Sequence, residues 1–557
     1  MLKKSIKLFI VTFAIALFAS LPAVACTGAY VGKKVSANGT TIIARTRDSN
    51  ILDSVSRRVV NKPLKADDDN PNYTEINGFT MEIPETTYRY ISGPLSTATG
   101  RGTFGASCIN SEGLAITATV TAIAHKEAIE ADPFVKTGIS EACIGDVVAM
   151  SCTSAEGAVK FLGDLVKKSG NAEPNVIMIA DQNEAWMMEF YTGHEWAAIK
   201  MPEDKVSVFG NAFNIDPVHE SYDAIIMSEN LVSTAEKNGF AKYDKENGKF
   251  DLFASYCGDE NIVPYSNMRN WYGLYTLGKN PEKEYHADKK YPTFFEPKGK
   301  IGVSDIAELY RSRYEGTEYC PDTSGRIDCR IIGTETQYSV DITEIYDDLP
   351  KQMCAVSWVC LDNAEFSPFI PFNNVIDDVS VIWSQDMTDF NDYTRNDIAF
   401  YAFQNLNVLS ITGRDTYGKG VRKYWKAVED YLMETYPDML KLTAELYEKD
   451  DMSATKFMTD YLKYIQNTSY ADALKINKEL EHYLALNQRT FDVKTSDDGK
   501  LVEYKHPEFE SELQEKINER YSVKSSGTTV EMSGLYSWIK RISNYAIKYI
   551  FNKKGMD

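Results

Sequence analysis

The feature that most constrains this chain is a cleavage-type junction directly before Cys26. Residues 1–25 have the three parts of a secretory signal peptide, namely a basic start, an apolar stretch and a small-residue end. These parts are formed by Lys3, Lys4 and Lys7, by residues 8–21, and by Ala23-Val24-Ala25. We therefore predict that the protein is exported, that cleavage follows Ala25, and that Cys26 begins the mature chain.

An N-terminal cysteine carries a thiol and a free α-amine on one residue. The α-amine has an ordinary pKa of about 7.7–8.0, so near neutral pH part of it is an unprotonated base. Such an amine can activate its own side-chain nucleophile, as it does for threonine. A second interpretation stays open, because bacterial lipoproteins are lipidated at a cysteine in this position. That processing prefers a Leu-like residue where this chain has Ala23.

The residues after Cys26 predict a β-hairpin. Residues 26–34 and 40–48 are rich in apolar and β-branched side chains, and Asn38-Gly39 between them favours a tight turn. A hairpin returns the chain to its start, so we expect Arg45 and Asp48 to lie near Cys26. A neighbouring guanidinium lowers the pKa of a thiol. Arg45 is therefore a candidate for stabilising the thiolate, and Asp48 is a candidate for holding the α-amine.

The segment Ala44-Arg45-Thr46-Arg47-Asp48, together with the N-terminal Cys-Thr, resembles the dipeptidase A family of cysteine peptidases, which are N-terminal-nucleophile hydrolases. The related penicillin V acylases and bile salt hydrolases share the Cys, the Arg and the Asp. Further segments keep that family's order over about residues 26–372. They are 109–114 (INSEGL), 131–135 (ADPFV), 138–139 (GI), 186–189 (WMME), 193–198 (GHEWAA), 211–215 (NAFNI), 270–273 (NWYG) and 367–371 (SPFIP). These later segments favour the dipeptidases over the acylases.

The resemblance implies an α+β fold, a four-layer αββα sandwich with a helical C-terminal extension. It also implies a secreted cysteine dipeptidase that hydrolyses dipeptides through a thioester on Cys26 and needs no metal or organic cofactor. In that scheme the Asn211 side chain is one oxyanion donor, and a backbone N–H near Thr119 or Val120 is the second. Two further candidates for the substrate and oxyanion region are Asn214 and Arg330. The arginine is a candidate for binding a ligand carboxylate or for positioning the asparagine.

Two other functions stay open. An acylase of the penicillin V or bile-salt type would use the same Cys26, Arg45 and Asp48 on an N-acyl amide. A non-catalytic surface lipoprotein would instead carry lipid on Cys26. The fate of Cys26 separates the lipoprotein from the two enzymes, and a panel of substrates separates the enzymes from each other.

Three regions follow the predicted signal peptide. Residues 26–385 carry the hydrolase motifs; we predict strands at 114–120, 175–180, 185–191, 196–199 and 206–210, and an amphipathic helix at 154–169. Residues 386–520 are predicted to be mainly helical, at 421–436, 439–449 and 455–466. Residues 521–557 are predicted to form a linker and a basic amphipathic helix, 535–554. This helix either lies on an anionic membrane surface or packs on the body.

The composition narrows the set of partners and cofactors. The chain has 80 acidic and 60 basic residues, which argues against nucleic-acid binding because that needs clustered Lys and Arg. No run of about 20 apolar residues follows the signal peptide, so no membrane span is expected. The nine cysteines include no Cys-x-x-Cys pair, so no structural zinc is indicated. Assembly into a homo-oligomer is left open.

Two further features involve cysteine and histidine. Cys320 and Cys329, like Cys354 and Cys360, are close enough in sequence to form disulfides, but an even number of cysteines does not require them. Among the six histidines, His194 is the best candidate for a Cys-His pair. We favour an interior or edge-strand histidine as the explanation of His194, and an N-terminal amine base makes a catalytic histidine unnecessary.

Overall fold

The computed structural model describes residues 26–48, 54–66, 71–97, 107–120, 122–326, 328–386, 397–487, 492–495, 497, 501–505 and 508–522. The predicted signal peptide and residues 523–557 of the predicted tail lie outside these ranges and stay predictions. The boundary predicted after residue 385 falls next to a gap in the described chain. None of the described helices has the length and apolar character needed to cross a membrane.

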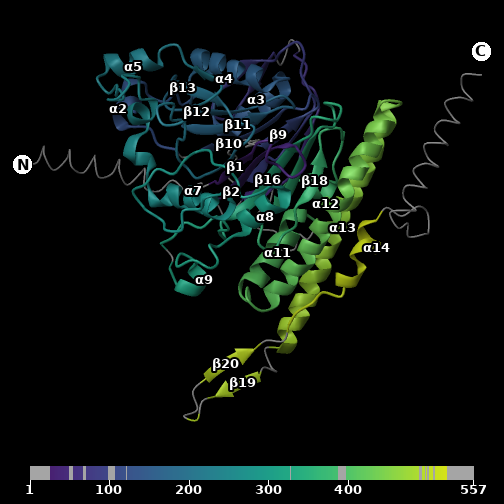
Figure 1. The fold of residues 1–557 in the computed structure, drawn as a ribbon. Helices are drawn as coiled ribbons and strands as arrows, with labels where there is room; N and C mark the ends of the chain where they lie inside the picture. Colours follow the sequence, from purple (N-terminus) through teal and green to yellow (C-terminus); the bar gives the residue numbers. More distant parts are fainter. Residues whose placement is uncertain are drawn as a thin grey trace, which may run out of the picture.

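Two antiparallel β-sheets form the centre of the protein (Figure 1). One has six strands in the order β14-β1-β2-β16-β17-β18. These strands are β1 (Gly28–Val31), β2 (Thr41–Asp48), β14 (Val206–Phe209), β16 (Gln337–Ile345), β17 (Ala355–Leu361) and β18 (Ile370–Asn373). The other has eight strands in the order β15-β13-β12-β11-β10-β9-β7-β4. These are β4 (Val59–Asn61), β7 (Tyr90–Ser92), β9 (Ser107–Asn110), β10 (Ala115–Val120), β11 (Asn175–Ala180), β12 (Ala185–Phe190), β13 (Trp196–Lys200) and β15 (Ile225–Met227).

Helices cover the outer face of each sheet. Helices α3 (Glu141–Ser151) and α4 (Ala155–Ser169) contact strands β9 to β12 of the eight-stranded sheet. Helices α7 (Pro264–Leu277) and α8 (Val303–Arg311) contact β14, β2 and β16 of the six-stranded sheet. Strand β2 also contacts β10 and β11 across the space between the sheets. These contacts confirm the predicted α+β class and the four-layer αββα sandwich.

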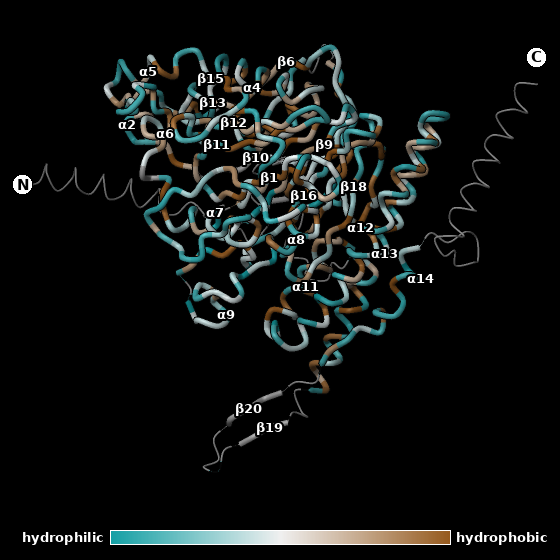
Figure 2. Tube along the Cα trace, in the orientation of Figure 1, coloured by the Kyte–Doolittle hydropathy of each residue, from teal (hydrophilic) through white to brown (hydrophobic). Residues whose placement is uncertain are grey.

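Strand β11 illustrates how the sequence builds the layers. Successive side chains of a strand point to opposite faces. Val176 and Met178 join the hydrophobic cluster shared with the six-stranded sheet, whereas Ile177 and Ile179 pack with the helical layer that contains Val147. Because both faces are covered, the strand is apolar from Val176 to Ala180. Figure 2 shows this hydrophobic character along the central strands.

The strands predicted in the hydrolase region correspond to β10, β11, β12, β13 and β14, each within one or two residues of its expected ends. The predicted helix at 154–169 is α4. Ser154 caps its start, since the Ser154 hydroxyl accepts a hydrogen bond from the N–H of Gly157. All nine cysteines are free thiols, so neither of the two sequence-adjacent pairs forms a disulfide.

The C-terminal helices lie beside the sandwich, with α11 (Ala399–Ile411) against β17 and α13 (Asp451–Asn487) against β18 (Figure 1). The helices predicted at 421–436 and 439–449 are one helix, α12 (Tyr417–Tyr447), so the predicted interruption is wrong. Pro437 lies inside it. Proline removes one backbone hydrogen bond, but its neighbours Tyr436 and Met439 are buried, and this packing keeps the helix continuous. The helix predicted at 455–466 is the middle of the longer α13.

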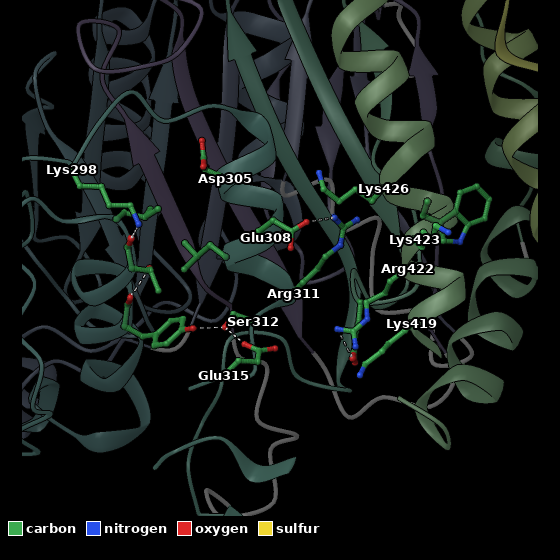
Figure 3. Close-up of a pocket in the computed structure, with 16 residues that line it drawn as sticks. Lys298, Asp305, Glu308, Arg311, Ser312, Glu315, Lys419, Arg422, Lys423 and Lys426 are labelled. Carbon is green, nitrogen blue, oxygen red and sulfur yellow. Dashed lines mark hydrogen bonds and ion pairs between the residues drawn. The ribbon is translucent and has the colours of Figure 1, made fainter. Parts of the chain in front are cut away.

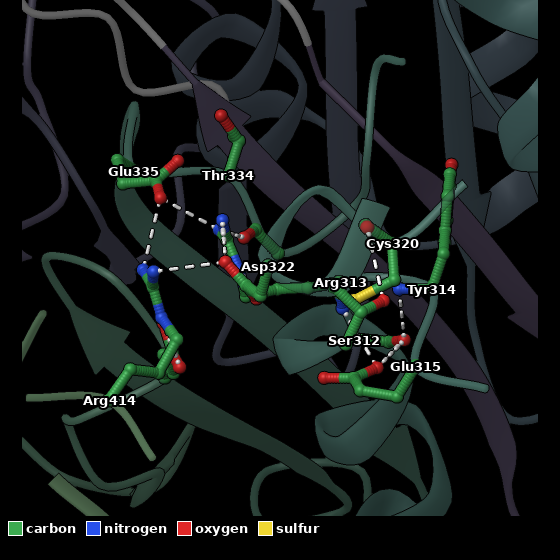
Figure 4. A network of polar contacts seen from close by, with 12 residues as sticks. Ser312, Arg313, Tyr314, Glu315, Cys320, Asp322, Thr334, Glu335 and Arg414 are labelled. Carbon is green, nitrogen blue, oxygen red and sulfur yellow. Dashed lines mark hydrogen bonds and ion pairs between the residues drawn. The ribbon is translucent and has the colours of Figure 1, made fainter. Parts of the chain in front are cut away.

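A buried ion pair joins α12 to the sandwich. Arg311, at the end of α8, donates to both carboxylate oxygens of Glu429 at 2.9 and 2.5 Å, and the N–H of Phe369 donates to Glu429 Oε1 at 2.9 Å. A second network, drawn in Figure 4, extends the connection to the loop before α12: Arg313 bonds Asp322, and both lie next to the Glu335–Arg414 pair. The helical region and the sandwich therefore share buried charges.

The smaller elements complete the described chain. The short strands are β3 (Ser54–Ser56), β8 (Leu95–Thr97), β5 (Asn72–Thr74), β6 (Thr80–Glu82), β19 (Asp492–Thr495) and β20 (Leu501–Lys505). The short helices are α2 (Lys126–Ala131), α5 (Leu231–Lys237), α6 (Leu252–Tyr256), α9 (Pro321–Ser324), α10 (Val381–Ser384), α14 (Ile517–Tyr521), and the 3-10 turns Gly258–Asn261 and Gln514–Lys516. The hairpin β19–β20 projects from the far end of the long helices (Figure 1).

Candidate active site

Cys26 lies at the start of the predicted hairpin, two residues before β1. Strands β1 and β2 pair antiparallel with Gly28 opposite Arg45, and the N–H of Thr46 donates to Thr27 O at 2.9 Å. The connecting turn ends at Gly39, whose φ of 73° is the left-handed conformation that glycine adopts without strain. The hairpin thus brings Arg45 beside Cys26, as predicted. Cys26 itself is 0% exposed.

The thiol of Cys26 is held by Arg45. Nη2 of Arg45 donates to Cys26 Sγ at 3.2 Å, and the same nitrogen is bonded to Glu141 Oε1. Arg45 is 2% exposed. Although burial lowers the pKa of its guanidinium, the negative charges of Cys26 and Glu141 outweigh this and raise that pKa above its usual range. Arg45 therefore stays cationic and can stabilise a thiolate.

The nitrogen of Cys26 faces Asn211. The Asn211 amide oxygen, Oδ1, accepts from Cys26 N at 3.3 Å. Asn211 follows β14, which pairs with β1 so that Phe209 lies opposite Gly28. The pairing of these two strands explains how residues far apart in sequence meet. Oδ1 is therefore the end of the Asn211 amide that faces Cys26 N.

Arg269, on α7, links Asn211 to Cys26 and was not predicted. Its Nη2 donates to Asn211 Oδ1 at 2.7 Å, and its Nη1 donates to the carbonyl oxygen of Cys26 at 2.6 Å. Burial and the charge of Arg330 lower the pKa of Arg269 to about 10, which leaves it cationic at neutral pH. Gly210 makes room for it, because a Cβ there would lie 2.7 Å from Nη2. A sequence signal for this arginine did exist, because Arg269 directly precedes the recognised segment 270–273.

Asp48 and Arg330 form an ion pair with each other. Arg330 Nη2 is bonded to Asp48 Oδ2, and Asp48 is fully buried. Burial raises the pKa of Asp48, while Arg330 and then Arg269 oppose that rise. Among the described contacts, the Cys26 nitrogen is bonded to Asn211, and Asp48 is paired with Arg330. The predicted positioning of the asparagine by Arg330 is performed here by Arg269.

The other predicted residues lie around this centre. Thr119 and Val120 end β10 and pair with Val176 and Asn175 of β11. Asn214 is engaged elsewhere: its Nδ2 donates to Ala212 O at 2.7 Å, and its N–H donates to Glu189 Oε1 at 2.5 Å. Asn214 therefore fixes the loop after Asn211.

His194 is not part of the Cys26 cluster. Its Nδ1 lies 2.8 Å from Asp132 Oδ1, and its side chain is 45% exposed. In the described ranges no group of three or more His, Cys, Asp or Glu residues has the arrangement of a metal site. A separate cavity of about 500 Å³ opens between α7, α8 and α12 and is lined by residues such as Tyr272, Glu308 and Arg422 (Figure 3). Cys26 is not among the residues that line it.

Comparison with known proteins decides the family. The profile described as peptidase family C69 matches residues 25–427. The chain belongs to peptidase family C69. The family shown by this match agrees with the predicted resemblance, and this C69 chain is accordingly a peptidase.

Curated relatives support the same assignment. A probable dipeptidase B of Lactococcus lactis subsp. lactis is 30% identical over 364 residues, which cover 63% of this C69 chain and 75% of the relative. A probable dipeptidase of Latilactobacillus sakei is 30% identical over 354 residues, or 62% and 74% of the two chains. A mutant conjugated bile acid hydrolase from Clostridium perfringens aligns over 62% and 92% of the chains with 10% identity. Its TM-score is 0.25, so the fold of this C69 chain is assigned from its own sheets and helices.

Proposed function

We propose that this C69 peptidase is an exported cysteine dipeptidase whose nucleophile is Cys26 after removal of residues 1–25. The observation that carries the proposal is that both reactive ends of Cys26 are held: Arg45 bonds the thiol, and Asn211 bonds the nitrogen. In the full chain that nitrogen belongs to a peptide bond and cannot act as a base. Cleavage after Ala25 would convert it to an amine with a pKa suited to proton transfer.

The proposed reaction uses the two ends of Cys26 in sequence. The α-amine takes the thiol proton, and the sulfur, stabilised by Arg45, forms a bond to the scissile carbonyl carbon. The carbonyl oxygen becomes an oxyanion, for which the Asn211 side-chain N–H and a backbone N–H near Thr119 or Val120 are the proposed donors. When the C–N bond breaks, the ammonium of Cys26 returns a proton to the leaving amine. Water then hydrolyses the thioester with the same amine as base.

The proposed substrate class rests on relatives. The similar proteins from Lactococcus lactis and Latilactobacillus sakei are named probable dipeptidases. The family match covers residues 25–427 and therefore includes all the residues given a role here. We accordingly propose dipeptides with a free N-terminus as the substrates.

The test begins with the exported protein. Its intact mass and N-terminal sequence should give an unmodified Cys26 as the first residue. The purified protein should cleave unblocked dipeptides in preference to penicillin V and glycine-conjugated bile salts. A lipid on Cys26 would support the lipoprotein alternative, and a preference for the N-acyl substrates would support the acylase alternative.

Variants then test the nucleophile. Cys26→Ala should abolish turnover, and Cys26→Ser should lose most of it because a hydroxyl is less acidic and less nucleophilic than a thiol. Cys360→Ser, at another buried cysteine, is the matched control and should retain activity. Turnover by Cys26→Ala, or full activity of a protein that still carries residues 1–25, would overturn the proposal.

A further inference from the structure

Glu141 presents an unused carboxylate oxygen beside the thiol. It is the first residue of α3 and is 4% exposed. Its Oε1 is bonded to the same Arg45 nitrogen that donates to Cys26 Sγ. No hydrogen bond to its second oxygen, Oε2, is found among the described residues, and Oε2 is not one of their fully buried unpaired atoms. Oε2 is therefore not closed off by the protein, and it can accept a hydrogen bond from a ligand.

We infer that Glu141 binds the free α-ammonium group of the substrate and thereby selects unblocked dipeptides. This inference rests on the proposed function and assigns a residue to its substrate selectivity. It concerns the side chain that recognises the amine, whereas Cys26, Arg45 and Asn211 act on the scissile carbonyl.

The geometry of a dipeptide fits this assignment. In a dipeptide the α-nitrogen lies only about 2.5 Å from the scissile carbonyl carbon, across two bonds. In a reactive complex that carbon lies about 3–3.5 Å from the attacking sulfur. Glu141 Oε1 and Cys26 Sγ are each one hydrogen bond from Arg45 Nη2. A substrate carbonyl at the sulfur therefore brings its α-ammonium within reach of the Glu141 carboxylate.

A second carboxyl group, that of Glu173, lies next to Glu141. Glu173 Oε1 accepts from the N–H of Glu141 at 2.8 Å. Burial, and then the charge of Glu141, raise the pKa of Glu173 to about 7. Glu173 precedes Asn175, which pairs with Val120 at the end of β10, so both carboxylates lie at the end of the sandwich that holds the proposed oxyanion donor. Arg45 bonds both the Glu141 carboxylate and the thiol, and a substrate ammonium would add a second positive charge beside that carboxylate.

The same arrangement disfavours N-acylated substrates. An acyl group at the α-nitrogen removes the positive charge and leaves a single neutral amide N–H in place of the three N–H donors of the ammonium. Sites built to bond a charged or polar substrate group reject analogues that lack it, because the buried partner stays unpaired. Glu141 therefore determines whether an enzyme with this nucleophile prefers free dipeptides, as a dipeptidase does, or N-acyl substrates, as an acylase does.

The test compares two substrates that differ only in the amino group, alanyl-alanine and propionyl-alanine. Wild-type protein with free Cys26 should prefer alanyl-alanine by kcat/KM. Glu141→Gln should reduce that preference by about 10- to 100-fold, the range for losing one hydrogen bond to a charged group, mainly through a higher KM for alanyl-alanine. Glu195→Gln is the matched control, since Glu195 is equally buried at 4% and bonds Ser228 and Thr234 instead. It should leave the preference unchanged.

A structural role for Glu141 would give a different pattern. If Glu141 only orients Arg45, Glu141→Gln would slow both substrates equally and leave the preference intact, which would overturn the inference. A wild-type measurement does not depend on the folding of any variant: alaninamide should protect Cys26 from iodoacetamide at a lower concentration than propionamide. Equal protection would also overturn it.

These outcomes separate the inference from the proposed function. Wild-type protein that cleaves neither compound would refute the dipeptidase proposal, whereas the protection experiment would still report on Glu141. Wild-type protein that cleaves alanyl-alanine, together with an unchanged preference in Glu141→Gln, would refute the inference alone.

Discussion

Asn211 and Arg269 are joined through a single oxygen: Arg269 Nη2 donates to Asn211 Oδ1 at 2.7 Å, and that oxygen also accepts from Cys26 N. A charge-assisted bond of this kind is stronger than a neutral one. It determines which end of the Asn211 amide faces Cys26. The orientation of the proposed oxyanion donor therefore depends on a residue 58 positions away in sequence.

We expect Asn211→Ala to lower kcat by about 10²–10³, the usual effect of removing one oxyanion donor. Cys26 should still react with iodoacetamide, because the thiol contact with Arg45 is unaffected. Asn211→Asp is the informative companion, since it retains the acceptor for Arg269 but replaces the donor nitrogen. It should lose activity as Asn211→Ala does. A near-normal rate for Asn211→Ala on the best dipeptide would refute the oxyanion assignment.

Arg269→Lys should reduce both stability and turnover. A lysine has one point of charge and cannot span the Cys26 carbonyl and Asn211 Oδ1 as the guanidinium does. Loss of one hydrogen bond to a charged group costs about 1.5–3 kcal/mol, measurable as the free energy of unfolding in urea. The kcat for dipeptides should fall with it. Unchanged kcat in a destabilised protein would limit Arg269 to a structural role.

The local part of the site could be predicted from sequence, and the long-range part could not. The apolar segments on either side of Asn38-Gly39 predict a hairpin, and the register of that hairpin places Arg45 opposite Gly28, close to Cys26. The Asn211 segment was recognisable by resemblance. Arg269 bonds Cys26 and Glu141 bonds Arg45 from two different helices, on opposite outer layers of the sandwich, and nothing in the local sequence encodes that meeting. The continuity of α12 through Pro437 was missed for the same reason, because packing of its buried face overrides the local signal.

Glu189 gives a prediction for the dependence of stability on pH. Burial raises the pKa of this 0% exposed carboxyl from 4.5 to about 7. Between these values the native protein keeps a proton that the unfolded chain has lost. The contribution of the protonated Glu189 to stability is therefore complete below pH 4.5 and is lost as the pH rises through 7. The free energy of unfolding of wild type minus that of Glu189→Gln should fall from about pH 5 to about pH 8. A difference that stays constant or rises with pH would contradict a raised pKa for Glu189.

Glu429→Gln should destabilise the protein by about 3–5 kcal/mol, because it removes the buried counter-charge of the buried Arg311. Urea unfolding measures the loss. Glu308→Gln is the matched control, since Glu308 bonds the same guanidinium but its side chain is 56% exposed. Its effect should stay within about 0.5 kcal/mol. Equal effects of the two substitutions would mean that burial does not set the strength of this pair.

The contact between α8 and α12 also bears on how such a gene could be shortened or recombined. Glu429, which neutralises Arg311, is two residues beyond the C-terminal end of the family match at residue 427. An expression product trimmed to the matched segment would retain the arginine and discard its counter-ion. A breakpoint that preserves a soluble product should therefore be sought after α13, so that the long helices are inherited together with the hydrolase layers.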